Sequence, residues 1–265
     1  MGRNMKHKHT IAFFAAALFW LLVWQGLSCL VQSQLLLPSP IEVCVALGGL
    51  VQQGDFWKSA LHSILRVMGG VGCGVVCGVV LAVICAKWST AKVLLAPLLA
   101  AVKAVPVASF IILAILWLHT TFVPALIAFL IVAPLVLSNV LTGIQNTPKE
   151  LLEMAEVYRF SFWKKLRAIY IPHCISYFHA ACRTGIGLGW KSAVAAEVIT
   201  RPKFGVGDRL FEAKMYLEVP EMFAWTVAVV VLSVAVEWLY RFGMQQTVWA
   251  KRGLLKDVHS FGEGR

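Results

Sequence analysis

The chain has 265 residues, of which 59% are hydrophobic and only 14% are charged, and its mean hydropathy is +0.77. Because a soluble domain usually carries about 25% charged residues, this composition excludes a water-soluble globule and makes the bilayer the expected solvent. The length accommodates roughly six spans of about 20 residues each. We therefore expect an all-α, polytopic membrane protein with six transmembrane helices.

The first expected span is an apolar run at 11–31. Three basic residues precede it, as in a secretory signal peptide. The run is longer than the apolar region of about 7–15 residues in such a peptide, and no A-x-A cleavage site closes it, so we expect a retained span. A Pro-bounded segment follows, and residues 41–58 should form a short amphipathic element outside the bilayer.

The next three spans are separated by breaks in an otherwise apolar sequence. The second covers 61–86. Residues 104–148 contain no Asp, Glu, Lys or Arg, and a single helix of that length would extend about 68 Å, more than twice the hydrocarbon thickness. The polar triplet at 119–121 is the expected turn, so spans three and four should cover 93–118 and 122–145.

Charged residues return at 147–172, in the loop that precedes span five. Span five is expected at 173–200. A polar loop, 201–220, then leads to span six at 221–241, which a polar tail follows.

The distribution of positive charge predicts the orientation. Six spans place both termini on one side of the membrane. With that side cytoplasmic, fifteen of the 24 lysines and arginines lie in inner segments, five in outer loops, and four in spans or at their ends. This bias follows the positive-inside rule and predicts cytoplasmic N- and C-termini. It also accounts for the net charge of +11 without a nucleic-acid partner.

The inner loop 147–172 contains two short helical patterns. Thr147 and Glu150 are spaced as a capping box, and Pro148 suits a first helical turn, so one helix should begin here. A second helix is expected at 162–169.

Two side chains set the expected bounds of the second helix. Ser161 is positioned to cap its start, and Pro172 should separate it from span five. Two short helices joined by a turn form a compact knob that projects from the bilayer. Composition alone leaves an alternative open, in which the helix pair lies flat on the headgroups with its basic residues facing anionic lipid.

The same loop resembles the EAA loop in the permease subunits of ATP-binding-cassette (ABC) importers, where E-A-A precedes a glycine and then I-x-L-P. The positions that carry the resemblance are Glu153, Met154, Ala155, Arg159, Ile169 and Pro172. Arg159 stands where the family has glycine. A left-handed backbone there would cost Arg about 1 kcal/mol more than Gly. We therefore expect a less sharp turn than the family norm.

Three further segments, 36–40, 63–66 and 193–198, look like the branch of these permeases that handles nitrate, sulfonate, taurine or bicarbonate. The resemblance covers roughly 35–242 and implies the type I importer permease fold in the bacterial inner membrane. The expected domains are an N-terminal tip with the first span (1–34), an extracytoplasmic connector (35–60), a permease core with the coupling loop (61–245) and a cytoplasmic tail (246–265).

The resemblance also implies partners. The loop would dock in a groove of cytoplasmic ATPase subunits, whose closure on nucleotide would turn two permeases from inward-open to outward-open, while a solute-binding protein delivers the ligand outside. A homodimer is expected, with a heterodimer left open. The sequence has no G-x-x-x-x-G-K-[ST] phosphate loop, so ATP hydrolysis should reside in another chain. We expect no catalytic residue, metal or cofactor.

The branch suggests a small anion as the solute, of the sulfonate, nitrate or bicarbonate type. A vitamin precursor such as a pyrimidine is the alternative. A stand-alone secondary transporter would need coupling-ion sites and usually an internal repeat of spans. A membrane-embedded enzyme would need His, Asp or Ser clustered at one depth. The sequence shows neither pattern.

Ionisable side chains inside spans indicate function by default. Lys191 lies deepest in span five and would attract an anionic solute, unless it pairs with Glu197 or snorkels toward the outer surface. Glu197 should pair with Arg201, one turn further on. Arg183 lies near enough to the inner end to reach cytoplasmic water or the gate. Pro106 would kink span three and line the cavity, or serve as a structural kink alone.

Glycines recur at helical spacing in two spans: Gly70, Gly74 and Gly78 in span two, and Gly185 and Gly189 in span five. Small residues on one face let helices approach closely in lipid. We expect these five to serve packing rather than chemistry.

Overall fold

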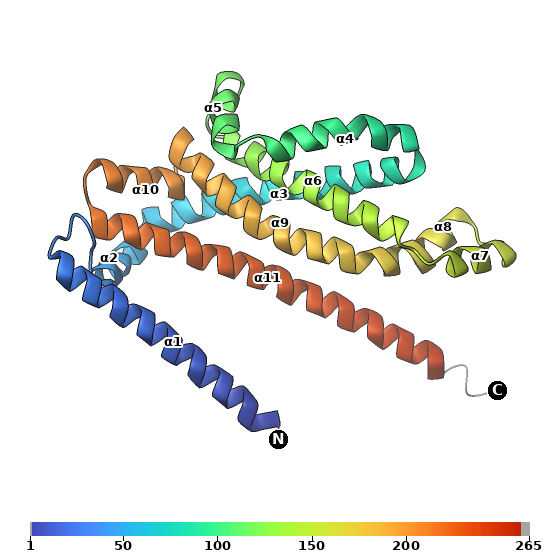
Figure 1. Ribbon diagram of the computed structural model, residues 1–265, viewed down its shortest axis with the longest axis horizontal. Helices are drawn as coiled ribbons and strands as arrows, with labels where there is room; N and C mark the ends of the chain where they lie inside the picture. The colour runs from blue at the N-terminus through green and yellow to red at the C-terminus, as the bar shows by residue number, and fades with distance from the viewer. Residues whose placement is uncertain (1, 261–265) are drawn as a thin grey trace.

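The computed structural model describes residues 2–260, with side-chain environments for residues 12 and 15–244, and all regular structure in that range is helical (Figure 1). The expected all-α class is confirmed. The elements are α1 (Gly2–Val31), α2 (Pro40–Gln52), α3 (Gly54–Lys87), α4 (Ser89–Ala104), α5 (Val107–Trp117), α6 (Val123–Gln145), α7 (Lys149–Val157), α8 (Phe162–Lys165), a π-helical turn η1 (Leu166–Tyr170), α9 (Ile171–Thr200), α10 (Val206–Met215) and α11 (Val219–Ser260). Much of the expected tail is thus part of α11, and residues 261–265 lie outside the described range.

Three helices are long and apolar enough to cross a bilayer: α3, α6 and the Val219–Met244 part of α11. The pair α4 and α5 supplies a fourth crossing if it counts as one broken span. Within the described residues, the apolar part of α1 is only Ala15–Val31, and α9 carries three charged side chains, Arg183, Lys191 and Glu197. The count of six spans and the cytoplasmic termini therefore stay predictions.

The expected third span is broken into two helices. The axes of α4 and α5 differ in direction by 104°, and both Val105 and Pro106 between them are extended, with ψ of 128° and 129°. Proline disfavours the helical conformation of the residue before it and has no N–H to continue the ladder. The expected kink at Pro106 is therefore present, and residues 93–118 do not form one unbroken helix; that these residues make one crossing stays a prediction.

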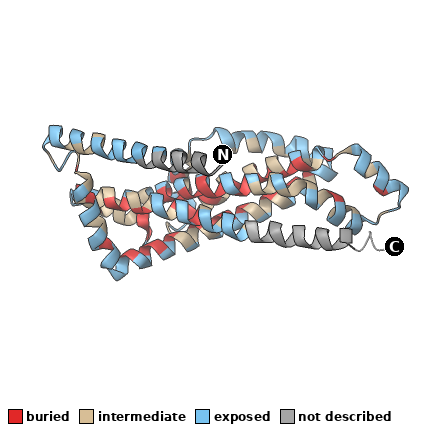
Figure 2. Ribbon diagram, turned by 90° about the horizontal axis from the view of Figure 1, so that it is seen from below, coloured by how far each residue is buried: buried red, intermediate tan, exposed pale blue. Residues whose placement is uncertain are grey.

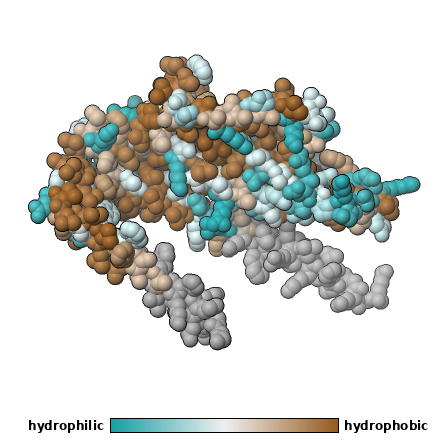
Figure 3. Space-filling view, viewed as in Figure 1, coloured by the Kyte–Doolittle hydropathy of each residue, from teal (hydrophilic) through white to brown (hydrophobic). Residues whose placement is uncertain are grey.

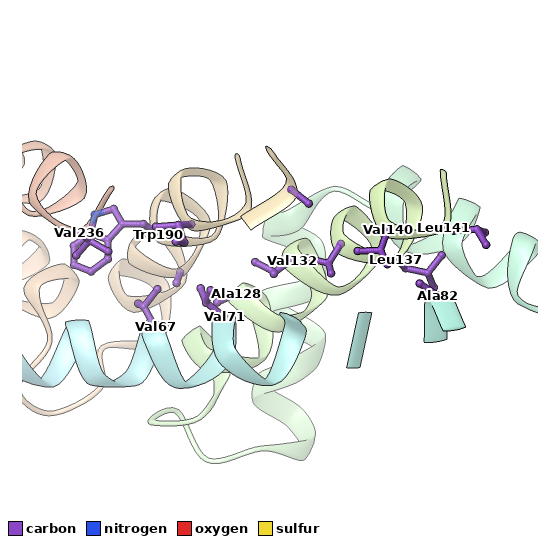
Figure 4. Packing of buried hydrophobic residues seen from close by; sticks show 14 of the residues in the cluster. Val67, Val71, Ala82, Ala128, Val132, Leu137, Val140, Leu141, Trp190 and Val236 are labelled. Atoms are coloured by element: carbon purple, nitrogen blue, oxygen red, sulfur yellow. The ribbon is translucent and has the colours of Figure 1, made fainter. Parts of the chain in front are cut away.

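The centre of the bundle is formed by α3, α6 and α9, which pack side by side (Figures 1 and 2). Val67 and Val71 of α3 meet Val132 of α6 and Trp190 of α9 in one buried cluster (Figure 4). Trp190 is fully buried, and its Nε1 donates to the Val229 carbonyl of α11 at 3.2 Å. The one polar group of this large side chain is thus satisfied inside the core.

Glycines let α3 approach α6 closely. A Cβ added at Gly70 would lie 2.1 Å from the Ala125 carbonyl oxygen, and one at Gly78 would lie 2.7 Å from that of Ala133. The predicted packing role is confirmed for all five glycines, and each of them faces α6: Gly70, Gly74, Gly78, Gly185 and Gly189.

Two groups of elements occupy opposite ends of the molecule. The end with α7 and α8 lies opposite the end with α2 and α10 (Figure 1), and Figure 3 shows more hydrophilic residues over the α7–α8 end than over the middle. The short element predicted at 41–58 is divided between α2, which Ser39 and Glu42 cap reciprocally, and the start of α3. By contrast, α1 diverges from the bundle, and its described residues include none that is buried (Figure 2).

Gly70→Ala should lower the stability of the protein by about 1–3 kcal/mol, because the added methyl group meets backbone atoms of α6. Gly69→Ala is the matched control, since a Cβ at Gly69 has nothing within 4 Å. Thermal unfolding of both variants in detergent would measure the difference. Equal losses in the two variants would contradict the packing described here.

Candidate functional site

The predicted coupling loop folds into a knob built from α7 and α8 at one end of the molecule (Figure 1). The two expected short helices are confirmed. Ala155 and Ile169 are buried, whereas Glu153 and Met154 are exposed. Arg159 and Pro172 are exposed as well, so two of the six motif positions are buried in the knob and four are exposed.

The start of α7 differs from the prediction. Its N-cap is Pro148, so the third helical residue is Leu151 rather than Glu150, and no side chain caps the helix. Thr147 is buried, and its hydroxyl donates to the Gly143 carbonyl of α6 at 3.4 Å. The predicted capping box is wrong, because a shift of one residue in register removes the spacing that a box requires.

The end of the knob also differs. The chain does not leave the helical conformation at Pro172; instead α8 continues through η1 into α9. The Ile171 N–H donates to the Leu166 carbonyl, which is the wider bonding pattern of a π-helical turn. Pro172 then falls in the first turn of α9, where a missing N–H is tolerated. The predicted separation is wrong. Ser161 does precede α8, but its hydroxyl makes no cap bond.

Arg159 adopts the left-handed backbone conformation, with φ of 50°. Its N–H donates to the Glu156 carbonyl at 2.9 Å, and the Phe160 N–H donates to the Ala155 carbonyl at 2.8 Å. These two bonds form a Schellman motif, the usual tight end of a helix. The expectation of a less sharp turn is therefore wrong, and arginine occupies the conformation that glycine would favour.

Arg159→Gly should stabilise this turn by about 1 kcal/mol, because glycine adopts a positive φ without a Cβ clash. Arg159→Ala keeps the Cβ and should gain nothing. Hydrogen exchange of the Phe160 amide, corrected for intrinsic rates, should slow about fivefold in the glycine variant alone. Equal exchange in all three proteins would show that the turn is not strained.

Among its charged residues, the outward surface of the knob carries four large, well-exposed apolar side chains, and three of the four are aromatic. Val157 is 80% exposed, Trp163 is 75% exposed, and Tyr158 and Phe162 are each 70% exposed. We call these four residues the knob cap. These four residues lie outside the family pattern and were not predicted as a site, although the aromatic residues that cluster at 158–163 were a signal in the sequence. Contiguous exposed apolar side chains of this size mark a contact surface.

A second candidate surface is the face of α9 that points away from α3 and α6. Arg183 and Lys191 are both exposed there, and neither has a hydrogen bond or ion pair within the part of the chain that the structure describes. The rest of this face consists of Ser176, Ala180, Thr184, Leu188, Ala195 and Ile199. An unpaired charge that faces hydrocarbon is costly, so this face favours water, another protein or, for a long side chain that snorkels, the membrane surface.

Glu197 lies off that face and is fully buried, with 0% of the residue exposed. It forms an ion pair with Arg66 of α3. Its Oε2 accepts the Ser63 hydroxyl at 2.7 Å and the Gly207 N–H at 3.2 Å. The carboxylate is therefore occupied on both oxygens, and Lys191 does not pair with it in this chain.

The predicted pair of Glu197 with Arg201 is wrong. The helix ends at Thr200, and Arg201 has φ of 50°, so its side chain leaves the helical spacing on which the prediction rested. Arg201 instead donates from Nε to Asp208 at 3.1 Å.

A third feature is an apolar pocket of about 240 Å³ at the break between α4 and α5, against α6. All nine residues that line it are apolar, Val105, Phe110 and Ile131 among them. Pro106 stands at the bend and is exposed, outside the lining. Its contribution to the pocket is the bend itself.

Residues 74–243 match the family of binding-protein-dependent transport system inner membrane components. The chain belongs to this family. It is an ABC importer permease, a multi-pass protein of the inner membrane, as the resemblance in the sequence implied. The matched region runs from within α3 to within α11 and includes the knob, the exposed face of α9 and the buried Glu197.

The permease is 32% identical to the riboflavin transport system permease protein of Chloroflexus aurantiacus over 220 residues, which cover 82% of each chain. It is 24% identical to a probable ABC transporter permease protein of Brucella abortus over 220 residues, 82% of this chain and 87% of the relative. A bicarbonate transport system permease protein of Synechococcus elongatus is 26% identical over 123 residues, 46% of this chain and 42% of that protein. These relatives are transport components rather than catalytic subunits.

Proposed function

We propose that this permease forms the translocation pathway for a small solute delivered by an extracytoplasmic binding protein, and that the knob is coupled to a separate cytoplasmic ATPase. The knob cap carries the proposal, because it exposes large aromatic side chains at one end of a continuous helix. Membership of the family supports ATPase and binding-protein partners in general. The chain itself then has no enzymatic role.

The composition of the knob supports a protein groove as its partner. Aromatic side chains that fill a groove usually dominate the energy of an interface, whereas charges at the rim contribute little. Trp163 and Phe162 would fill the groove, and the exposed carboxylate of Glu153 would lie at its rim. A knob that lay on lipid headgroups would expose the same aromatic residues without needing an ATPase, so the partner must be tested directly.

Trp163→Ala should weaken recovery of the ATPase with the purified permease about 30-fold, as expected for a central aromatic residue of an interface. Glu153→Ala should have a smaller effect. Trp88→Ala is the control, because Trp88 is also aromatic and 53% exposed but lies between α3 and α4. Co-purification and ATPase activity would be measured together.

Two results would contradict the coupling role of the knob. One is unchanged ATPase recovery and activity in both knob variants. The other is chemical labelling that reaches residues 150–165 only from the external side of the membrane.

We infer that the exposed face of α9 lines the translocation pathway. Arg183 and Lys191 are unpaired on a face that otherwise bears small or polar side chains at most positions. A second copy related by twofold symmetry would set two such faces opposite each other around water, which supports a homodimer. Pro106 and Glu197 then shape the route without facing it, one by bending the chain and the other by fixing the end of α9.

A small anion is the solute class that α9 supports best, because the face carries two cations and its other named residues include no carboxylate. The second candidate is a vitamin-like ring compound such as a pyrimidine precursor. The relative named for riboflavin favours it, as does the apolar pocket at the α4–α5 break. A hydrocarbon lining suits a flat organic ring better than an inorganic anion, which would leave its hydrogen bonds unmet.

Lys191→Gln should lower uptake of the anionic solute about tenfold or more, because a contact with a charged partner is lost. Lys191→Arg keeps the charge and should retain most uptake. Proteoliposomes that contain the permease and its ATPase, with the binding protein added on the side that corresponds to the outside, would be tested with labelled taurine, nitrate, bicarbonate and riboflavin. If every solute that is taken up by the wild type enters the glutamine variant equally fast, Lys191 is not on the pathway.

A further inference from the structure

The helix α10 begins without a cap from its own segment. Its N-cap is Gly205, which has no side chain to accept a hydrogen bond. The first N–H groups of any helix lack intrahelical partners. Here other helices supply them: the Val206 N–H donates to the Ser63 hydroxyl of α3 at 2.9 Å, and the Gly207 N–H donates to Glu197 of α9 at 3.2 Å.

These acceptors belong to one connected network. Ser63 itself donates to Glu197 at 2.7 Å, and Arg66 joins Glu197 in an ion pair while its second nitrogen donates to the Lys203 carbonyl at 3.4 Å. We call Ser63, Arg66 and Glu197 the α10 latch. A carboxylate at the N-terminus of a helix also interacts favourably with the helix dipole. The latch therefore fixes both the loop before α10 and the first turn of α10.

The backbone of α10 lies directly against the buried carboxylate. A Cβ at Gly207 would lie 2.4 Å from the Glu197 Cβ, and one at Gly205 would lie 3.2 Å from its Oε2. Glu197 is fully buried, and the Arg66 side chain is 8% exposed. Separation of α10 from α9 would take the Gly207 N–H away from the buried Glu197 carboxylate, and this charge-assisted hydrogen bond would be lost although Ser63 and Arg66 of α3 remain in place.

We propose that Glu197 is a positioning residue that makes α10 move together with α9 when the knob is displaced. This proposal rests on the proposed function of the knob. Since α9 runs without a break from η1 to Thr200, its two ends join the knob and the latch. The turn after α10 exposes Met215, Tyr216 and Leu217, which suits contact with the binding protein. The latch then transmits movement driven by the ATPase to that surface.

Hydrogen–deuterium exchange of the purified permease–ATPase complex, with and without ATP plus vanadate, tests this proposal. In the wild type, trapping should change exchange both in the knob, residues 149–165, and in α10 with the loop before it, residues 203–215. Glu197→Gln keeps the size of the side chain but removes its charge. The knob response should persist in this variant, and the α10 response should fall about fivefold or more, because the charged acceptor of the α10 amides is lost.

Two further variants complete the experiment. Ser63→Ala removes one hydroxyl from the latch and should reduce the α10 response by a smaller factor. It replaces Glu197→Gln as the test variant if the glutamine variant does not fold. Glu212→Gln is the control, because Glu212 lies on α10 outside the latch and, among the described residues, forms an ion pair only with the partly exposed Arg209, at 2.9 Å. Both responses should be unchanged in this control.

The outcomes separate the latch from the proposed function. An α10 response that is unchanged in the latch variants would overturn the proposal, as would a wild type in which the knob responds and α10 does not. A latch that serves stability alone would weaken both responses together, which also overturns it. If the knob of the wild type does not respond at all, the proposed coupling fails first, and the knob peptides of the same experiment show this directly.

Discussion

The continuity of α9 is the constraint on which the functional account depends. Pro172 lies where a helix would ordinarily begin afresh, because proline donates no hydrogen bond and crowds the preceding turn. The chain accommodates it by widening one turn, η1, immediately before α9. The knob is therefore joined to a helix of 30 residues by helical backbone rather than by a loop. A displacement of α8 therefore meets no loop before α9 in which it could be absorbed.

The packing of α9 gives this continuity its effect. Along its length α9 presses against α6, where Gly185 and Gly189 allow close approach, and at its far end Glu197 is bound to α3 and α10. The face that remains exposed carries Arg183 and Lys191. One helix thus combines a coupling end, a pathway face and an anchored far end. In lipid, where apolar contact alone does not drive helices together, small residues and satisfied polar groups hold such an arrangement in place.

Much of the fold could be predicted because it follows from local properties of the chain. The lengths of the apolar runs predicted α3, α6 and α11, and the polar triplet at 119–121 predicted the turn before α6. The spacing of the glycines predicted the close packing of α3 and α9 against α6. The failures concern features that local spacing does not determine. A shift of one residue removed the capping box at Thr147, and propensity argued against the left-handed Arg159 that the Schellman bonds impose.

The buried network of Ser63, Arg66 and Glu197 shows most clearly what could not be predicted from the sequence. Helical spacing favoured Arg201 as the partner of Glu197, but the true partners, Ser63 and Arg66, lie 134 and 131 residues away in sequence. Only the packing of α3 against α9 brings them together. The knob cap was missed for a different reason: the family pattern emphasises positions that the fold partly buries, while the exposed aromatic residues lie between them.

An electron cryomicroscopy reconstruction of the permease with its ATPase in a lipid nanodisc tests the central claim most directly. The account predicts Trp163 within about 4 Å of side chains in an ATPase groove, with α8, η1 and α9 continuous beneath it. A knob that touches only lipid, with the ATPase bound elsewhere or absent, would contradict the account.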